Sequence, residues 1–434
     1  MVSEAVDLLS RLIRIDTSNP PGREKAAADF ITEILDREKI AWRTYEPAPE
    51  RMSVRAVIPG TGQKKPLILL NHLDTAPADG RGWSFDPFGG DVRDGFVRGR
   101  GALDMKGLGV MELLAFLDIK RQGIVPCRDL IFLAVADEEA GGAFGVEHLL
   151  NNHEADFRAG LVLNEGGFGL EGLLPGRTVH MISSAEKGPC WLRLVRTGSP
   201  GHGSMPHGNN ALEKLVAAAA RVAAAPQPLA VAPVVKEYFR RLGAAGWNFL
   251  QPFVEDGRSE TLLRLLRESG LLGRPEISAM LQNTVSLNRL YSGFKINVIP
   301  DRAEAELDAR LLPGQEIDAF CESLRRLLAD DDIQVERITA FEATASPAIS
   351  EDFCLLERAL GRHFPDAAVA PSLSVGTTDS RFFRRRGVSA YGFFPVVAAV
   401  ADLKMVHGFD EKISVENLER GTRILTEVVR ELCL

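Results

Sequence analysis

The chain has few cysteines, and they are isolated from one another. The five stand far apart, at Cys127, Cys190, Cys321, Cys354 and Cys433, and no Cys-x-x-Cys motif occurs. An odd number of isolated cysteines argues against a disulfide framework and against a zinc site built from thiolates. The sequence is therefore typical of a reducing compartment, and any bound metal must be held by histidine and carboxylate side chains.

Long apolar runs and an excess of positive charge are also absent. No run of about 18 or more apolar residues occurs, so we expect no transmembrane helix. The formal net charge of -8 argues against a nucleic-acid partner, which would need a basic face. The opening residues, MVSEAVDLLSRLIRIDT, have the pattern of an amphipathic helix and lack the features of a signal peptide. We therefore expect a cytoplasmic protein with no membrane and no nucleic-acid partner.

The first part of the chain has the pattern of an α/β domain. At 434 residues the chain is too long for one compact core, so we expect two domains. Within residues 1–183, short apolar runs such as residues 66–71 (PLILLN) and 129–136 (DLIFLAVA) alternate with helical patterns. This alternation predicts a catalytic domain with a mostly parallel sheet and helices on both faces.

The pattern changes in the middle of the chain. Residues 188–197 and 295–310 alternate in period two, as antiparallel strands with one exposed face do. We expect residues 184–343 to form an inserted α+β lid and dimerisation domain, which includes an enlarged helical segment at 226–282. Residues 344–434 return to the α/β pattern and should complete the catalytic domain.

Polar residues that can bind a metal follow several of the predicted strands. In open α/β sheets, ligands bind at the carboxyl ends of the strands. Taken singly, each residue has an ordinary structural explanation, such as a satisfied histidine, a helix cap or a solvated acid. The residues are His72 and Asp74 after PLILLN, Asp137, Glu138 and Glu139 after DLIFLAVA, Glu165 after GLVLN, Asp104 at the start of a helix, and His407 before the last helix.

Taken together, these residues indicate a metal site. Several carboxylates at one sheet edge would repel one another and raise their pKa values, and a cation relieves that repulsion. Two histidines with carboxylates and no cysteine suit zinc or a neighbouring divalent metal. One carboxylate can also bridge two metals about 3.5–4 Å apart, which is the spacing used in two-metal hydrolysis.

Six polar and glycine-rich segments stand out along the chain. In chain order they are HLDTAP, WSFDPFGGDVRDGFVRGRGALDMKG, ADEEAGG, NEGG, GHGSMPHGNNA and VHGFDEKIS. Together they resemble the aminoacylase, carboxypeptidase G and succinyl-diaminopimelate desuccinylase family of dinuclear zinc hydrolases. The similarity covers nearly the whole chain, and RGRGALDMKG together with ADEEAGG is its most specific part. The long segment at 226–282 is similar to the larger carboxypeptidase S-like branch.

The resemblance implies a set of metal ligands. His72, Asp104 and Glu165 would hold one metal, and Asp104, Glu139 and His407 would hold the other, so that Asp104 bridges the pair. The resemblance implies zinc, although histidine and carboxylate ligands also accept cobalt or manganese.

Three further residues receive roles from the same motifs. Asp74 would accept the ring N–H of His72, and Glu138 would act as the general base that takes a proton from the water between the metals. His202 would donate to the developing oxyanion, and in dimeric relatives this histidine comes from the partner subunit. The family often has a cis peptide after the bridging aspartate, so we expect one between Asp104 and Met105.

Four other residues match positions that bind the substrate's carboxylate. Arg310 and Asn297 match lid positions, and a planar guanidinium suits a carboxylate. On local pattern alone, both residues could instead form pairs on a strand surface. Gly376 and Thr377, in SVGTTDSRFF, match a loop that contacts the same group.

The implied function is hydrolysis of an amide bond next to a free carboxylate on a small substrate, in a homodimer. Glu at position 165 goes with deacylases and carboxypeptidases in this family, whereas Asp goes more with aminopeptidases. We favour an N-acyl-amino-acid deacylase, with a metallocarboxypeptidase or dipeptidase acting on short peptides as the alternative. A non-catalytic metal-dependent binding protein is a third hypothesis, but the presence of Glu138 argues against it.

Overall fold

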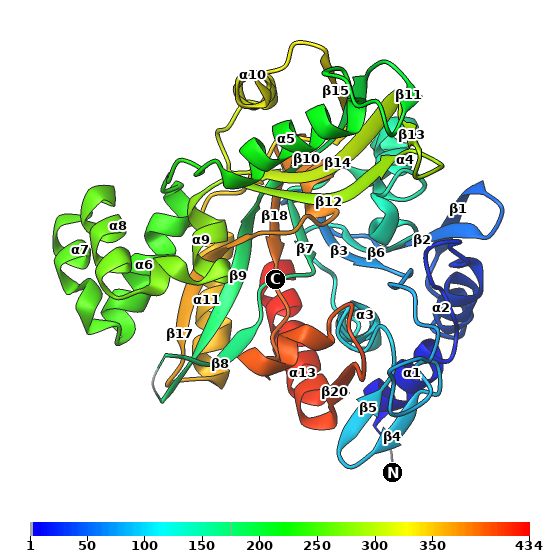
Figure 1. Cartoon of the computed structure of the whole chain (residues 1–434). Helices are drawn as coiled ribbons and strands as arrows, with labels where there is room; N and C mark the ends of the chain where they lie inside the picture. Colours follow the sequence, from blue (N-terminus) through cyan, green and yellow to red (C-terminus); the bar gives the residue numbers. More distant parts are fainter. Residues whose placement is uncertain (1–2, 175) are drawn as a thin grey trace.

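The computed structural model describes residues 3–174 and 176–434, in which the strands form one large sheet and several smaller ones (Figure 1). Among these residues the large sheet has eleven strands, in the order β1-β2-β6-β3-β7-β18-β9-β8-β19, with β16 and β17 also paired to β9. Its strands are β1 (Trp42–Ala48), β2 (Arg51–Ile58), β3 (Leu67–His72), β6 (Leu130–Val135), β7 (Leu161–Asn164), β8 (Gly169–Leu174), β9 (Arg177–Glu186), β16 (Thr344–Ala345), β17 (Ala368–Ser374), β18 (Ser389–Gly392) and β19 (Val397–Ala399).

The centre of this sheet is parallel. Strands β6, β3, β7 and β18 run in the same direction, while antiparallel pairs extend the sheet through β2 on one side and β9 on the other. The α/β fold that the sequence predicts is therefore confirmed.

Both faces of the sheet are buried, because apolar residues follow one another without a polar alternation. In β3, Leu67 and Leu69 belong to one core, while Ile68 and Leu70 belong to a second core on the opposite face. The first core is covered by α1 (Glu4–Ile13), α2 (Lys25–Arg37), α3 (Lys106–Arg121), α11 (Glu351–His363) and α13 (Val415–Cys433). The second is covered by α4 (Val146–Asn152) and α12 (Ser380–Arg384). This two-sided burial is what a parallel sheet requires.

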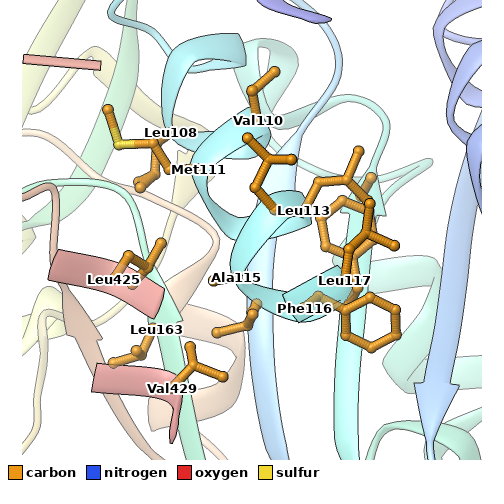
Figure 2. Packing of buried hydrophobic residues seen from close by; sticks show 14 of the residues in the cluster. Leu108, Val110, Met111, Leu113, Ala115, Phe116, Leu117, Leu163, Leu425 and Val429 are labelled. Carbon is orange, nitrogen blue, oxygen red and sulfur yellow. The ribbon is translucent and has the colours of Figure 1, made fainter. Parts of the chain in front are cut away.

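Helix α3 is buried on nearly all sides, which fixes the position of the loop that precedes it. Its residues from Lys106 to Leu117 are all buried. Figure 2 shows the sheet residue Leu163 and the α13 residues Leu425 and Val429 together beside α3. Because Asp104 lies just before this helix, the packing holds Asp104 at a fixed place beside the sheet.

The second sheet has four antiparallel strands, in the order β12-β14-β10-β15. These are β10 (Gly188–Thr197), β12 (Thr284–Ser292), β14 (Arg302–Leu311) and β15 (Ile333–Ala340). Alternate residues of β14 are buried under α5 (Ala211–Ala224) and α10 (Ile317–Leu328), as expected for a sheet with one exposed face. The domain boundaries at residues 183 and 343 stay a prediction.

The helical segment within residues 226–282 packs on the large sheet. It contains α6 (Pro233–Ala245), α7 (Gln251–Asp256), α8 (Ser259–Glu268) and α9 (Pro275–Leu281). Phe239 of α6 shares a core with Val179 of β9 and Ala370 of β17. The predicted helices of this segment are therefore present, and they cover strands of the large sheet (Figure 1). Helices α5 and α10, by contrast, cover the four-stranded sheet.

Lys187 lies where the chain passes from β9 to β10. Its side chain is buried, and Nζ donates hydrogen bonds to Ala279 O, Gln282 O and Thr284 Oγ1 at 2.9–3.1 Å. Burial lowers the pKa of Lys187 to about 8. One ammonium therefore ties the crossover between the sheets to the end of α9 and the start of β12.

Two small sheets complete the described strands. The sequence Asp94-Gly95 predicts a hairpin, and the structure has β4 (Asp91–Arg93) and β5 (Phe96–Arg98) there, with β20 (Lys412–Ser414) beside β5. Strand β11 (Gly201–His202) pairs with β13 (Val298–Ile299). None of the helices in the described part of the chain has the length and apolar character needed to cross a membrane.

Candidate metal centre

The register of the parallel strands brings the predicted ligands to one edge of the sheet. His72, the last residue of β3, is opposite Val135, the last residue of β6. Strand β7 pairs with the other side of β3 and ends just before Glu165. Residues that follow these three strands therefore emerge side by side.

Asp104 lies between the two histidines. Its Oδ1 is 3.1 Å from Nε2 of His72, and its Oδ2 is 3.1 Å from Nε2 of His407. A carboxylate with one oxygen toward each histidine has the geometry of a bridge between two cations.

Two groups of side chains offer ligand atoms that all lie within 4.8 Å of one another. One is Asp104, Glu139 and His407, which is the second ligand set that the motifs imply. The other joins His72 and Glu165 with Glu138, and Asp104 adjoins it through His72. Glu139 Oε2 is 3.1 Å from His407 Nε2, and Glu165 Oε1 is 3.7 Å from His72 Nε2.

The donor set fits divalent cations. Glu139 Oε1 is buried and has no hydrogen-bond donor among the described residues, so one carboxylate oxygen is left for an ion. Imidazole and carboxylate ligands without thiolate suit zinc, cobalt or manganese. The five implied ligands thus have the chemistry that two adjacent cations need. They are His72, Asp104, Glu139, Glu165 and His407.

The charges of the site balance one another only if a cation or proton is present. Burial and repulsion by neighbouring carboxylates raise the pKa values of Glu138 and Glu165 well above the usual range. Burial alone would raise the pKa of Asp104, but hydrogen bonds from His407 and His72 lower it. The hydrogen bond to Asp104 raises the pKa of His407 to about 10. Because ligands must lose these protons, metal binding should release protons.

Asp74 connects His72 to the turn that carries Glu138 and Glu139. The backbone carbonyl of Asp74 is 2.9 Å from His72 Nδ1, and its carboxylate Oδ1 is 3.4 Å from the same atom. The carboxylate accepts the backbone N–H groups of Glu138 and Glu139 at 3.1 and 3.0 Å. The predicted partner of His72 is therefore nearby, with the carbonyl as the closer acceptor.

The turn after β6 depends on a buried polar network. Asp137 has a left-handed φ of 74° and accepts hydrogen bonds from Arg51 and Asn19. Arg51 also forms a two-point ion pair with Glu24, and burial raises the pKa of Glu24 to about 7. Asn19 also donates to Asp74. Residues from the N-terminal segment therefore fix the positions of Asp74 and Asp137, which lie next to the metal ligands.

Glu411 fixes the loop that presents Asp104. Its carboxylate is fully buried and accepts the backbone N–H groups of Leu103 at 2.7 Å and Asp104 at 3.0 Å. Arg100 donates to Glu411 at 2.7 Å and to the carbonyl of Gly408 at 2.7 Å. The Arg100–Glu411 pair therefore links the loop of Asp104 to the loop of His407.

We expect Glu411→Gln to weaken metal binding about 10- to 100-fold, as is usual when groups that orient ligands are changed. The carboxylate of Glu411 accepts hydrogen bonds on both oxygens, whereas the amide of glutamine would place an NH₂ group opposite one set of these N–H donors. Metal affinity can be measured by competition with a chromophoric chelator. The exposed Glu416→Gln is the matched control, and unchanged affinity in Glu411→Gln would remove Glu411 from this role.

The peptide between Asp104 and Met105 is cis, as the family resemblance implies. The peptides before Pro20 and Pro21 are cis as well.

Two residues beside Glu138 are not among the predicted site residues. Asp379 is buried, neither of its carboxylate oxygens has a donor among the described residues, and burial raises its pKa to about 7. Arg381 donates to the carbonyl of Gly141 at 2.7 Å, and its Nη1 is 4.0 Å from Glu138 Oε1. The only sequence signal is their position in TTDSR, directly after the predicted Gly376 and Thr377.

The predicted lid residues lie apart from the metal ligands. His202 and Asn297 are neighbours, because the N–H of Gly203 donates to the carbonyl of Asn297 at 2.9 Å, and both are exposed. His202 Nδ1 is 2.8 Å from the hydroxyl of Ser204. No hydrogen bond or ion pair within residues 3–174 and 176–434 joins His202 to the ligand clusters.

The predicted carboxylate-binding residues have separate surroundings. Arg310 pairs with Asp308 at 2.7 Å and lies over the ring of Trp191, at 5.5 Å from its centroid. Gly376 is exposed and Thr377 is half-buried in the turn after β17.

A cluster of histidine and carboxylate ligands at the carboxyl ends of parallel strands, with a buried acid beside it, defines a metal-dependent hydrolase. The chain belongs to peptidase family M20/M25/M40, whose model matches residues 68–431.

Individual relatives agree with this assignment. The human N-fatty-acyl-amino acid synthase/hydrolase PM20D1 is 30% identical over 376 residues, which cover 84% of this chain and 74% of that protein. Pig (Sus scrofa) aminoacylase-1 is 28% identical, over 99% of this chain and 95% of that protein. The M20 family metallo-carboxypeptidase Sso-CP2 from Sulfolobus solfataricus has a similar fold, with a TM-score of 0.75 at 18% identity, and the match covers 99% of each chain.

Proposed function

We propose that the protein is an N-acyl-amino-acid deacylase, which hydrolyses the amide bond next to the free carboxylate of a small substrate. The position of Asp104, with one oxygen toward each histidine, is the observation that carries this proposal. The similarity to aminoacylase-1 and to an N-fatty-acyl-amino acid hydrolase favours acyl amino acids over peptides.

The proposed mechanism assigns a role to each group around the two metals. Two divalent cations, of which zinc is the best fit, would polarise the substrate carbonyl and lower the pKa of an attacking water. Glu138 takes the proton from this water and delivers it to the leaving nitrogen. Burial and repulsion by Glu165 raise the pKa of Glu138, which favours its uptake of the proton in the first of these transfers.

The carboxylate of the substrate should bind on the side of the lid. We assign this contact to Arg310, Asn297, Gly376 and Thr377, as the motifs imply. Arg310 would exchange its pair with Asp308 for a two-point contact with the substrate, which a guanidinium can make without changing its charge.

We also propose that the active unit is a homodimer, in which His202 of one subunit serves the metal centre of the other. Strand β12 is at the edge of its sheet and exposes Leu287, Leu290 and Tyr291. An unpaired strand edge with exposed apolar side chains is suited to pairing with a second copy. His202 would then donate to the developing oxyanion from across the interface.

The substrate class can be tested with matched compounds. After addition of zinc, cobalt or manganese, we expect turnover of N-acyl amino acids at a kcat/KM at least about tenfold above that of dipeptides with the same C-terminal residue. This ratio corresponds to a difference of about 1.4 kcal/mol in transition-state stabilisation. Initial rates of amino-acid release give both values. If only peptides are hydrolysed, the second candidate, a metallocarboxypeptidase or dipeptidase, takes the place of the deacylase, as the fold of Sso-CP2 also allows.

A further inference from the structure

We propose that a recess beside His407 is the subsite for the acyl group and that it selects large apolar acyl groups. This inference rests on the proposed deacylase function and extends it, because it assigns the residues that choose the acyl chain.

The recess lies between two loops, and its lining includes one implied metal ligand, His407. It has a volume of about 520 Å³, and its walls include Pro77, Ala78, Trp83, Phe409 and the ligand His407. Pockets of about 300–1,000 Å³ with mainly apolar walls are typical of small-molecule sites. An occupant of this recess would therefore touch a metal ligand at one end and apolar side chains along its length.

Phe409 gives the recess an apolar wall that is largely exposed. Its side chain is 59% exposed, although phenylalanine is usually buried. The ring lies against Gly82, where an added Cβ would come within 2.9 Å of the ring. Glycine at this position therefore lets the end of the ring approach the loop at the edge of the recess.

The charged groups of the lining already have partners. Asp79 accepts a hydrogen bond from Arg81 Nε at 2.6 Å. Arg100 is paired with Glu411, and its guanidinium lies over the ring of Trp83, at 5.1 Å from the centroid. Because these charges are satisfied, the recess favours an uncharged apolar group over the carboxylate of the substrate.

The position of the general base decides which half of the substrate enters the recess. Glu138 groups with His72 and Glu165, whereas His407 is on the other side of Asp104. A base that protonates the leaving nitrogen must have the amine half of the substrate on its own side. The two substituents of the amide carbon point apart, so the acyl group extends away from Glu138, toward His407.

The test uses a series of N-acyl forms of one amino acid, from acetyl to octanoyl. Each buried methylene should raise kcat/KM about fourfold, the equivalent of about 0.8 kcal/mol. With partial burial, we expect the octanoyl-to-acetyl ratio of kcat/KM in the unchanged protein to be at least about 100.

Two variants should lower this ratio at least about tenfold. Ala78→Trp fills the recess, and Phe409→Ala removes an exposed wall without leaving a buried cavity. The exposed Ala244→Trp in α6 is the matched control and should leave the ratio within about twofold. Metal content and circular dichroism identify any variant that fails to fold, and Phe409→Ala then serves alone.

Failure of the inference can be distinguished from failure of the proposed function. If no N-acyl amino acid is hydrolysed but peptides are, the deacylase function is wrong. If acyl amino acids are hydrolysed with a flat ratio, or if both variants keep the ratio, the recess is not the acyl subsite. Loss of a dimer in Ala78→Trp with an unchanged ratio would assign the recess to a second copy of the chain and overturn the inference.

Discussion

Replacing Glu138 with alanine is expected to lower kcat about 10²- to 10⁴-fold while both metals stay bound. Glu138 is beside the ligand Glu139 but belongs to a different group of side chains, with His72 and Glu165. Its removal takes away the group that moves the proton, and it leaves the Asp104 bridge and both histidines in place. The loss should therefore appear in kcat, with little change in metal affinity.

Single-turnover rates and metal content, measured on the same preparation, test this expectation. Glu154→Ala, which removes an exposed glutamate, is the matched control and should keep the original kcat. A Glu138→Ala protein that binds two metals and retains its rate would assign the base to another residue. A protein that loses its metals would instead make Glu138 a ligand.

Replacing His202 with alanine should lower kcat about 10²- to 10³-fold, which is the usual effect of losing one oxyanion donor. Metal affinity should change little, because His202 is exposed and is not part of either ligand cluster. His207, in the same motif, is the matched control, and His207→Ala should have a much smaller effect on kcat.

Mixing two inactive variants tests whether His202 acts across a dimer. Coexpression of His202→Ala chains with Glu138→Ala chains gives mixed dimers in which one of the two sites has both residues. Random pairing in a twofold dimer should then restore about a quarter of the original activity. If no activity returns, His202 serves the metal centre of its own chain or has no role there.

The parts of the fold that could be predicted from the sequence are those with a strong local pattern. The apolar strands before His72, Glu138 and Glu165 have no polar alternation, and they form the parallel centre of the large sheet. The period of β14 likewise reports one buried face. In each case the order of apolar and polar residues indicates which side chains are buried, so the strand can be predicted without knowledge of distant contacts.

Strands without such a pattern were missed. Strand β12 is at a sheet edge and is exposed along most of its length, so its residues do not alternate between buried and exposed. Strand β1 is also at an edge and has a similar pattern. The apolar periodicity of the residues in α6 to α9 predicts helices, but it does not indicate which sheet these helices cover.

The same limit applies to the metal centre. The predicted ligands meet because each follows a recognisable strand or motif. Glu411 and Asp379 could not be assigned in advance, because their environments depend on backbone groups and loops far away in the chain. Glu411 binds the amides of Leu103 and Asp104, more than 300 residues earlier, and nothing near it in the sequence indicates those partners.

The hydrogen bonds of Lys187 have a consequence for any attempt to shorten the chain. Excising the helical segment would remove the acceptors at Ala279 and Gln282 and leave a buried ammonium without them. In a truncated chain, Lys187 would therefore have to be replaced by a neutral residue if the two sheets are to keep their present connection. The additional helices are thus a structural part of the crossover, and the length of this region is tied to the identity of a single lysine.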